Sequence, residues 1–184
     1  MLFRSETLEK MNEYTRIIFY KTFDEPVDNL PAHITHIEFG DDFNHPVNNL
    51  PPSVTYIEFG ICFNQSIDTL PINLEYLSLG ALFNHSIENL PPNLKTLILR
   101  HYGSIKLSED IDLHPNLDTI PDSIENLIIH YYECKLTKLP SKLKILDFKA
   151  VKYRFQIATL NNTYLEKLIT NQFGIDNQIT FIHD

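Results

Sequence analysis

The chain has 184 residues, of which 43% are hydrophobic, so it is long enough for one folded domain and too apolar for intrinsic disorder. Its formal net charge is −9, with 15 Lys and Arg against 24 Asp and Glu; this balance argues against binding to nucleic acid and fits either solubility or a basic partner. It has no apolar stretch of the ~18 residues that a membrane span needs, no signal peptide and only two cysteines, so we expect an intracellular, cytoplasmic protein that binds no membrane.

The first 13 residues precede the repeats and are predicted to form an N-terminal cap. Ser5 to Glu13 fits a short amphipathic helix with Leu8 and Met11 on one side. A solenoid needs such a cap because its terminal coil would otherwise expose the core.

An internal repeat of twenty residues runs through residues 14–160. Its most regular boundaries are the pairs Leu30-Pro31, Leu50-Pro51, Leu70-Pro71 and Leu90-Pro91. The spacing loosens at Ile120-Pro121 and Leu139-Pro140. A fixed period of this length is typical of solenoids, in which each coil stacks on its neighbours. We therefore predict about seven coils, interrupted by an insertion at residues 101–119.

Three apolar columns recur in each repeat, in the order L-x-x-L-x-L of a leucine-rich-repeat strand. The second and third columns are two residues apart, which places their side chains on one face of a strand. The second column is Ile17, Ile37, Ile57, Leu77, Leu97, Leu127 and Leu146. Stacked coils would pair these strands, and the many prolines disfavour a long helix opposite them. The predicted fold is a leucine-rich-repeat-like solenoid with a parallel β-sheet on one face, irregular turns and short extended pieces on the other, and little helix.

The turns contain three more columns. A phenylalanine column is predicted to fill the core, and an asparagine column to form a buried ladder whose amides satisfy backbone groups. Glycines follow the strands, where a tight turn can require a positive φ. The phenylalanines are Phe23, Phe43, Phe63 and Phe83, the asparagines are Asn44, Asn64 and Asn84, and the glycines are Gly40, Gly60 and Gly80.

Five-residue segments after the strands resemble a known family. The segments Phe43-Asn44-His45-Pro46-Val47, Phe63-Asn64-Gln65-Ser66-Ile67 and Phe83-Asn84-His85-Ser86-Ile87 look like the Phe-Asn-x-Pro-Ile signature of FNIP repeats. The Leu-Pro frame around them matches as well. The resemblance covers residues 14–100 closely and residues 101–160 in degenerate form.

The FNIP family is similar to leucine-rich repeats and is found in amoebae and in the large DNA viruses that infect them. The resemblance implies a protein-interaction module with another protein as its partner, no cofactor, no enzymatic activity and, for a viral protein, a location in the host cell. Some members carry an F-box that recruits a ubiquitin ligase. Too little sequence precedes the first repeat here to hold an F-box, so a role in substrate recognition would need a separate F-box partner.

Side chains between the apolar columns are predicted to point outward, onto the surface that solenoids commonly use for binding. Tyr56 and Tyr76 are neighbours there, and they fit either a binding hot spot or a stabilising cross-strand ladder. Ile98 and Ile128 fit either an apolar contact patch or a surface covered by the insertion, which is itself a second candidate for specificity. The residues predicted to bind a partner are Arg16, His36, Glu38, Tyr56, Glu58, Tyr76, Ile98, Arg100, Tyr102 and Ile128.

The sequence does not indicate metal or redox chemistry. His45 and His85 share a column two coils apart, about 10 Å by strand spacing, which is too far for one ion. Cys62 and Cys134 lie more than three coils apart, roughly 15 Å, beyond the reach of a disulfide. There is also no nucleophile elbow or phosphate loop.

Residues 161–184 are predicted to form a C-terminal cap. Tyr164 to Ile169 fits either a helix or one more degenerate strand, and Ile179 to Ile182 fits a short strand. The leading functional hypothesis is a non-catalytic protein-binding solenoid, monomeric or weakly homo-oligomeric. The alternatives are a substrate-recognition subunit for ubiquitin ligation and a self-assembling structural protein.

Overall fold

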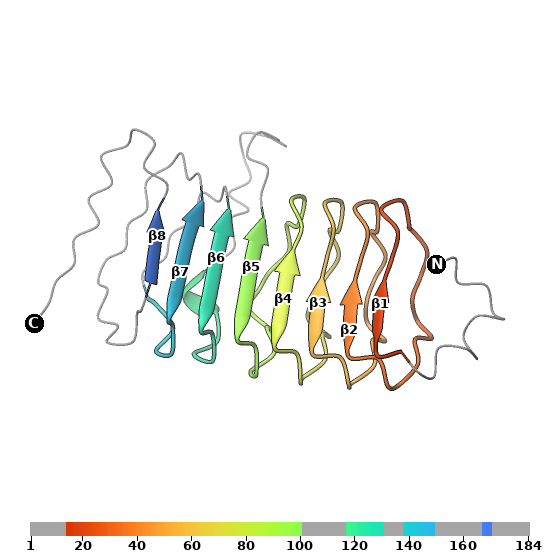
Figure 1. Cartoon of the computed structure of the whole chain (residues 1–184), viewed down its shortest axis with the longest axis horizontal. Helices are drawn as coiled ribbons and strands as arrows, with labels where there is room; N and C mark the ends of the chain where they lie inside the picture. Colours follow the sequence, from red (N-terminus) through yellow and green to blue (C-terminus); the bar gives the residue numbers. More distant parts are fainter. Residues whose placement is uncertain (1–13, 101–116, 131–137, 150–166, 171–184) are drawn as a thin grey trace, which may run out of the picture.

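The computed structural model describes residues 14–100, 117–130, 138–149 and 167–170. Eight parallel strands form one sheet whose spatial order is the order of the sequence (Figure 1). The strands are β1 (Arg16–Ile18), β2 (His36–Glu38), β3 (Tyr56–Glu58), β4 (Tyr76–Leu79), β5 (Thr96–Arg100), β6 (Asn126–His130), β7 (Ile145–Lys149) and β8 (Lys167–Thr170). The predicted fold class, a parallel solenoid of leucine-rich-repeat type, is confirmed.

The sheet has one strand more than the seven coils that we predicted, and it lies at the C-terminal end. β8 belongs to the segment from which we expected a C-terminal cap, so the sheet continues past residue 160, and the strand alternative was the right one for Lys167–Thr170. The N-terminal cap and the tail strand predicted at residues 179–182 lie outside the described residues. In the described part of the chain, the helical structure is the single 3₁₀ turn η2 (Leu117–Thr119), at the end of the predicted insertion.

In each regular coil, a tight turn that begins at a proline leads to the first apolar column. The Ile34 amide donates to the Pro31 carbonyl oxygen at 3.1 Å, and the Val54 amide donates to the Pro51 carbonyl oxygen in the same way. Proline fits this position because its fixed φ is compatible with the turn and its missing N–H is not needed there. The turn delivers the first apolar column into the core, where Ile34 is fully buried.

The core is a stack of layers, one for each coil, with equivalent positions one above the other. The Phe43 and Phe63 rings are parallel with centroids 6.1 Å apart, and Phe59 stacks on Phe63 at 3.7 Å. Such pairs contribute roughly 0.5–1.5 kcal/mol beyond the burial of their area. Phe23, in the first coil, is only partly buried. Large side chains in register across coils therefore set the stacking of the N-terminal half.

The glycine column has a different cause from the one expected. None of Gly40, Gly60 and Gly80 adopts a positive φ, so the prediction of a left-handed turn was wrong. Instead, a Cβ on Gly40 would lie 1.8 Å from the Tyr20 carbonyl oxygen, and one on Gly60 would lie 2.1 Å from the Gly40 oxygen. The column is glycine because each coil packs directly on the backbone of the preceding one.

The asparagine column forms a ladder, but at the surface and not in the core. The Asn44 side-chain oxygen accepts from the Asn64 amide at 2.8 Å, and Asn64 accepts from the Asn84 amide at 2.8 Å. Asn44 is exposed and Asn64 half-buried, so the expectation of a buried ladder was wrong. Phe43 and Val47 fill the interior beside it, leaving the amide at the rim.

Candidate interaction surface

The outward side of the sheet, here called the strand face, carries two columns of side chains. The pairing of β1 to β7 places the members of each column on neighbouring strands. The first column is Arg16, His36, Tyr56, Tyr76, Thr96, Asn126 and Ile145, and the second is Ile18, Glu38, Glu58, Ser78, Ile98, Ile128 and Asp147. The structure therefore brings most of the predicted binding residues onto one surface.

Three aromatic rings of the first column form a continuous ring stack. His36 and Tyr56 are 3.7 Å apart between ring centroids and within 8° of parallel, and Tyr56 and Tyr76 are 4.0 Å apart at 8°. All three side chains are half-buried. Hydrogen bonds and stacking fix their rotamers, so the ring stack offers solvent a rigid row of ring edges.

Glu38 sits beside the ring stack and ties β1 to β2. Its Oε1 accepts from the Arg16 guanidinium and lies 2.9 Å from His36 Nε2. Partial burial alone would raise the pKa of Glu38, but the hydrogen bonds from His36 and Arg16 outweigh it and hold that pKa below its usual value. Glu38 is therefore a carboxylate whose Oε1 is engaged within the chain.

Glu58 occupies the next position and is held through both oxygens. Tyr56 donates its hydroxyl to Oε2 at 3.1 Å, and Arg100 Nη1 donates to Oε1 at 2.8 Å. Burial, with the neighbouring Tyr76 and Glu58, raises the pKa of the Tyr56 hydroxyl, so Tyr56 stays a neutral donor. Because both glutamates pair with cations of this chain, their adjacency is not by itself a sign of a basic partner.

The Arg100 bridge passes over an intervening strand. Arg100 is on β5 and Glu58 on β3, and β4 between them presents Ser78 at the second column. Ser78 is fully buried, and its hydroxyl has no hydrogen-bond partner among the described residues. A small side chain at this position leaves room for the guanidinium to cross.

The predicted apolar patch of Ile98 and Ile128 is largely buried. Ile98 is 7% exposed and Ile128 half-buried, so Ile98 does not offer a contact surface. Tyr102 lies outside the described residues. In the second column, Ile18 is the exposed aliphatic side chain at 54%.

The strand face also contains a groove that the sequence-based reasoning missed. It is an open depression of about 260 Å³ at the ends of β1–β3. It is lined by Ile18, Lys21, Glu38, Asp41 and Glu58, together with Gly40 and two phenylalanines. The available signal was the position of Glu38 and Glu58 in one column beside the glycine column. We call it the glycine groove.

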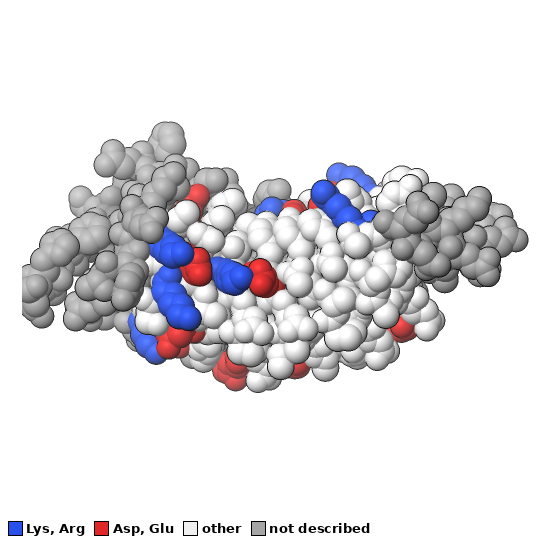
Figure 2. Space-filling view, turned by 60° about the horizontal axis from the view of Figure 1, so that its bottom comes forward, with Lys and Arg blue, Asp and Glu red and all other residues white. Residues whose placement is uncertain are grey.

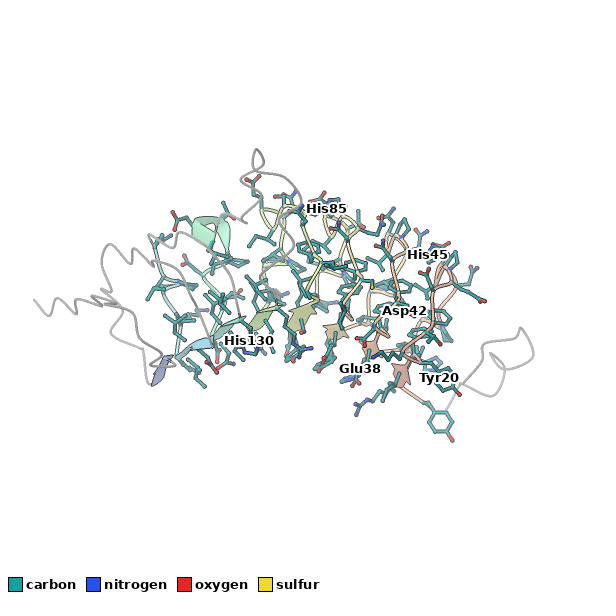
Figure 3. The ribbon with its side chains drawn as sticks, turned by 90° about the horizontal axis from the view of Figure 1, so that it is seen from above. Tyr20, Glu38, Asp42, His45, His85 and His130 are labelled. Carbon is teal, nitrogen blue, oxygen red and sulfur yellow. The ribbon has the colours of Figure 1, made fainter. Side chains whose placement is uncertain are left out.

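Two histidines outside the ring stack, His45 and His85, serve in coil stacking. His45 Nε2 lies 3.0 Å from the Asp24 carbonyl oxygen, and His85 Nε2 lies 3.1 Å from the Asn64 carbonyl oxygen. Viewed along the strands, both lie on the side of the solenoid away from Glu38 (Figure 3). Among the described residues, no three His, Cys, Asp or Glu side chains gather as a metal site requires.

Two other features bear on the class of the protein. The thiol of Cys62 is free and half-buried. In the described part of the chain, no helix has the length and apolar character needed to cross a membrane.

The sheet, the coil turns and the ladders define a leucine-rich-repeat-like solenoid. The family model described as FNIP Repeat matches residues 23–62 and 63–102. Residues 23–102 therefore contain FNIP repeats, as the five-residue segments indicated.

A solved structure supports the same class. The crystal structure of CroV588, a protein from a giant virus described as a novel circular LRR protein, shares 30% sequence identity with this chain and a TM-score of 0.63. The similarity covers 76% of this chain and 21% of that one, so this chain spans about a fifth of the length of CroV588. A comparison with curated proteins found no match.

Proposed function

We propose that the chain is a non-catalytic protein-binding module whose partner contacts the strand face. The FNIP and leucine-rich-repeat-like families are interaction scaffolds. Such solenoids present an extended surface whose shape is set by the stacked coils. The strand face offers one, from Arg16 on β1 to Arg100 on β5.

The single observation that carries the proposal is the fixed ring stack with its two flanking carboxylates. Association is costly when long side chains must be ordered, at about 0.5–1.5 kcal/mol for each. His36, Tyr56 and Tyr76 are already ordered by parallel stacking, and Glu38 and Glu58 by hydrogen bonds. A partner therefore meets a surface that loses little entropy on binding.

Stacking of further copies on β1 is disfavoured by one residue. Tyr20 occupies the column position of Gly40, and a Cβ on Gly40 would meet the backbone of the preceding coil at 1.8 Å. A coil that approached β1 as closely as the first coil approaches Gly40 would meet the Tyr20 Cβ in the same way. Figure 3 shows the Tyr20 side chain projecting away from the coils, and it is 56% exposed. We therefore favour a partner that is not another copy stacked in this manner.

The test is affinity capture from a lysate of the native cell, read by mass spectrometry. Wild type is compared with the Tyr56→Ala/Tyr76→Ala double variant, and the matched control is Ile72→Ala. Ile72 is 63% exposed at a turn and lies outside the strand face. We expect a protein that wild type and the control retain and that the double variant loses, with all three folded by circular dichroism. Identical profiles for the three proteins would refute binding through the ring stack.

A further inference from the structure

The glycine groove combines an apolar wall with acidic groups. Ile18 is 54% exposed, and it forms part of the groove. Three carboxylates, Glu38, Asp41 and Glu58, line the groove with Lys21, and each already pairs with one cation of this chain, namely Arg16, Lys21 and Arg100 respectively. With a volume of about 260 Å³, the groove is smaller than the roughly 300–1,000 Å³ of sites for drug-sized ligands and suits a single side chain.

The acidic groups of the groove differ in how far they are already engaged. Both oxygens of Glu58 accept hydrogen bonds from this chain. Glu38 uses only Oε1 among the described residues, and Asp41 pairs with Lys21 through Oδ2 at 3.1 Å. Within the described residues, Glu38 Oε2 and Asp41 Oδ1 are thus the acceptors left for a ligand in the groove. Lys21 is 76% exposed, so its pair with Asp41 is weak and screened by solvent.

We propose that the glycine groove binds the side chain of a lysine on the partner protein, an inference that rests on the proposed function. The methylene stem of the lysine lies against Ile18, as long charged side chains lie on apolar surface. Its ammonium donates to Glu38 Oε2 and to Asp41.

Lysine fits this set of acceptors better than arginine. A guanidinium pairs most strongly with both oxygens of one carboxylate at once. Glu38 Oε1 is occupied by Arg16 and His36, both oxygens of Glu58 are occupied, and Asp41 Oδ2 pairs with Lys21, so bidentate pairing is disfavoured throughout the groove. An ammonium has three donors that can point to acceptors on different residues. The acidic net charge of −9 further favours a basic partner.

The experiment is a titration of the ¹⁵N-labelled full chain with blocked peptides, followed by amide chemical shifts. The probe is acetyl-Gly-Lys-Gly-amide, and its partners in the comparison are the Nε-acetyl-lysine and the arginine versions. We expect saturable shifts at Gly40 and Asp41 with the lysine peptide, a response at least fivefold weaker with arginine, and none with acetyl-lysine. Equal responses to the lysine and acetyl-lysine peptides, or no response at Gly40 and Asp41, would overturn the inference.

Variants of exposed residues keep the test independent of folding. Lys21→Gln removes the ammonium that competes for Asp41, so we expect lysine-peptide affinity to rise about two- to fivefold. Ile18→Ala shortens the apolar wall and is expected to lower that affinity about threefold. Glu75→Gln, an acid outside the groove, is the control and should leave it unchanged. A loss of affinity in Lys21→Gln, or an equal loss in Ile18→Ala and Glu75→Gln, would contradict the binding of lysine in the glycine groove.

The two proposals fail in different ways. If the peptide titration is negative but capture still depends on Tyr56 and Tyr76, only the lysine groove is refuted. If the titration is positive but capture does not depend on the ring stack, the groove stands and the proposed contact surface is refuted.

Discussion

The coils of β2 and β3 and those of β5–β7 share one fold but differ in the residue at the glycine position, directly after the third apolar column. β2 and β3 have three residues each, and the glycines after them lie against the preceding backbone. The later three strands have five residues, with Arg100 and His130 at the glycine position. There the sheet continues, and Arg100 pairs with His130. A side chain at this position prevents the close approach, so the chain stays extended and the strand gains two residues.

The same two regions differ in the column that precedes each strand. Thr35 and Thr55 donate their hydroxyls to the carbonyl of the preceding coil, both at 3.3 Å. In the C-terminal coils, charges alternate instead, with Lys95 on Glu75 at 2.9 Å and Lys144 on Glu125 at 2.7 Å. Acidic and basic side chains alternate across this part of the surface in Figure 2. The same backbone repeat can therefore be linked from coil to coil either by threonine hydrogen bonds or by ion pairs.

The largest expected effect is that of a methyl group in the glycine column. Gly60→Ala places a Cβ 2.1 Å from the Gly40 carbonyl oxygen, and we expect the free energy of unfolding to fall by about 3 kcal/mol or more. Tyr20→Ala, in the same column but exposed, should change it by no more than about 0.5 kcal/mol. Urea denaturation of both variants measures the difference. A Gly60→Ala protein as stable as wild type would show that the coils do not approach this closely.

The asparagine ladder is expected to rank next. Asn44→Leu removes the acceptor of the Asn64 amide at 2.8 Å and should cost about 1 kcal/mol. Asn48→Leu is the matched control, because within the described residues the Asn48 side chain accepts only from the Thr69 hydroxyl. Its cost should be a few tenths of a kcal/mol. Equal losses in the two variants, by the same denaturation, would show that the ladder does not stabilise the turn specifically.

The Arg100 bridge joins the two regions that differ. Arg100→Ala removes the 2.8 Å contact with Glu58, and since the guanidinium is 40% exposed we expect a cost of about 0.5–1 kcal/mol. Arg100→Lys should recover little of it, because Lys offers a single charged centre in place of the guanidinium fork. A double-mutant cycle with Glu58→Gln measures the coupling. Strictly additive losses would show that the bridge contributes nothing.

The Glu38 cluster predicts an acid-dependent stability. The pKa of Glu38 is lower in the folded chain than its usual 4.5, so its contribution is fully present above that value. It is lost as pH falls through the lower, folded pKa. Glu38→Gln should therefore flatten the pH dependence of unfolding at acid pH and leave its shape near neutrality unchanged. Parallel curves for wild type and Glu38→Gln in acid would contradict this assignment.

The smallest expected effect is that of salt on the alternating charges. Raising ionic strength screens exposed pairs such as Lys95–Glu75 more than the neutral threonine ladder. Hydrogen exchange at high and low salt should show slightly lower protection of Thr96 and Asn126 amides, with Tyr56 unchanged. If salt lowered protection only around Tyr56, the ion pairs of the C-terminal coils would not be the salt-sensitive contacts.

Much of the fold could be predicted from the repeat. The apolar columns at Ile17, Ile37 and Ile57 predicted the strands because period-two spacing and a constant repeat length leave one way to stack. The cause of the glycine column was not readable, since a close approach between Gly60 and Gly40 depends on how two coils pack. The depth of Asn44 was misjudged because a residue beside a buried phenylalanine need not itself be buried.

The candidate surface was only partly predictable. Spacing placed Tyr56 beside Tyr76 and Glu38 beside Glu58, because residues twenty apart become neighbours in a regular solenoid. Ile98 is buried, but residues 101–116 of the insertion that the second alternative placed over it lie outside the described residues. The bridge from Arg100 to Glu58 joins residues 42 positions apart, so no repeat column predicted it.

The sequence by itself determined the period, the parallel strands, the family and the columns that face inward or outward. These features depend on local spacing, which stays the same in every coil. The tertiary structure decided which carboxylate oxygens remain available, why the turns need glycine, and where a groove opens on the strand face. These depend on distances between coils, which the stacking of whole layers fixes.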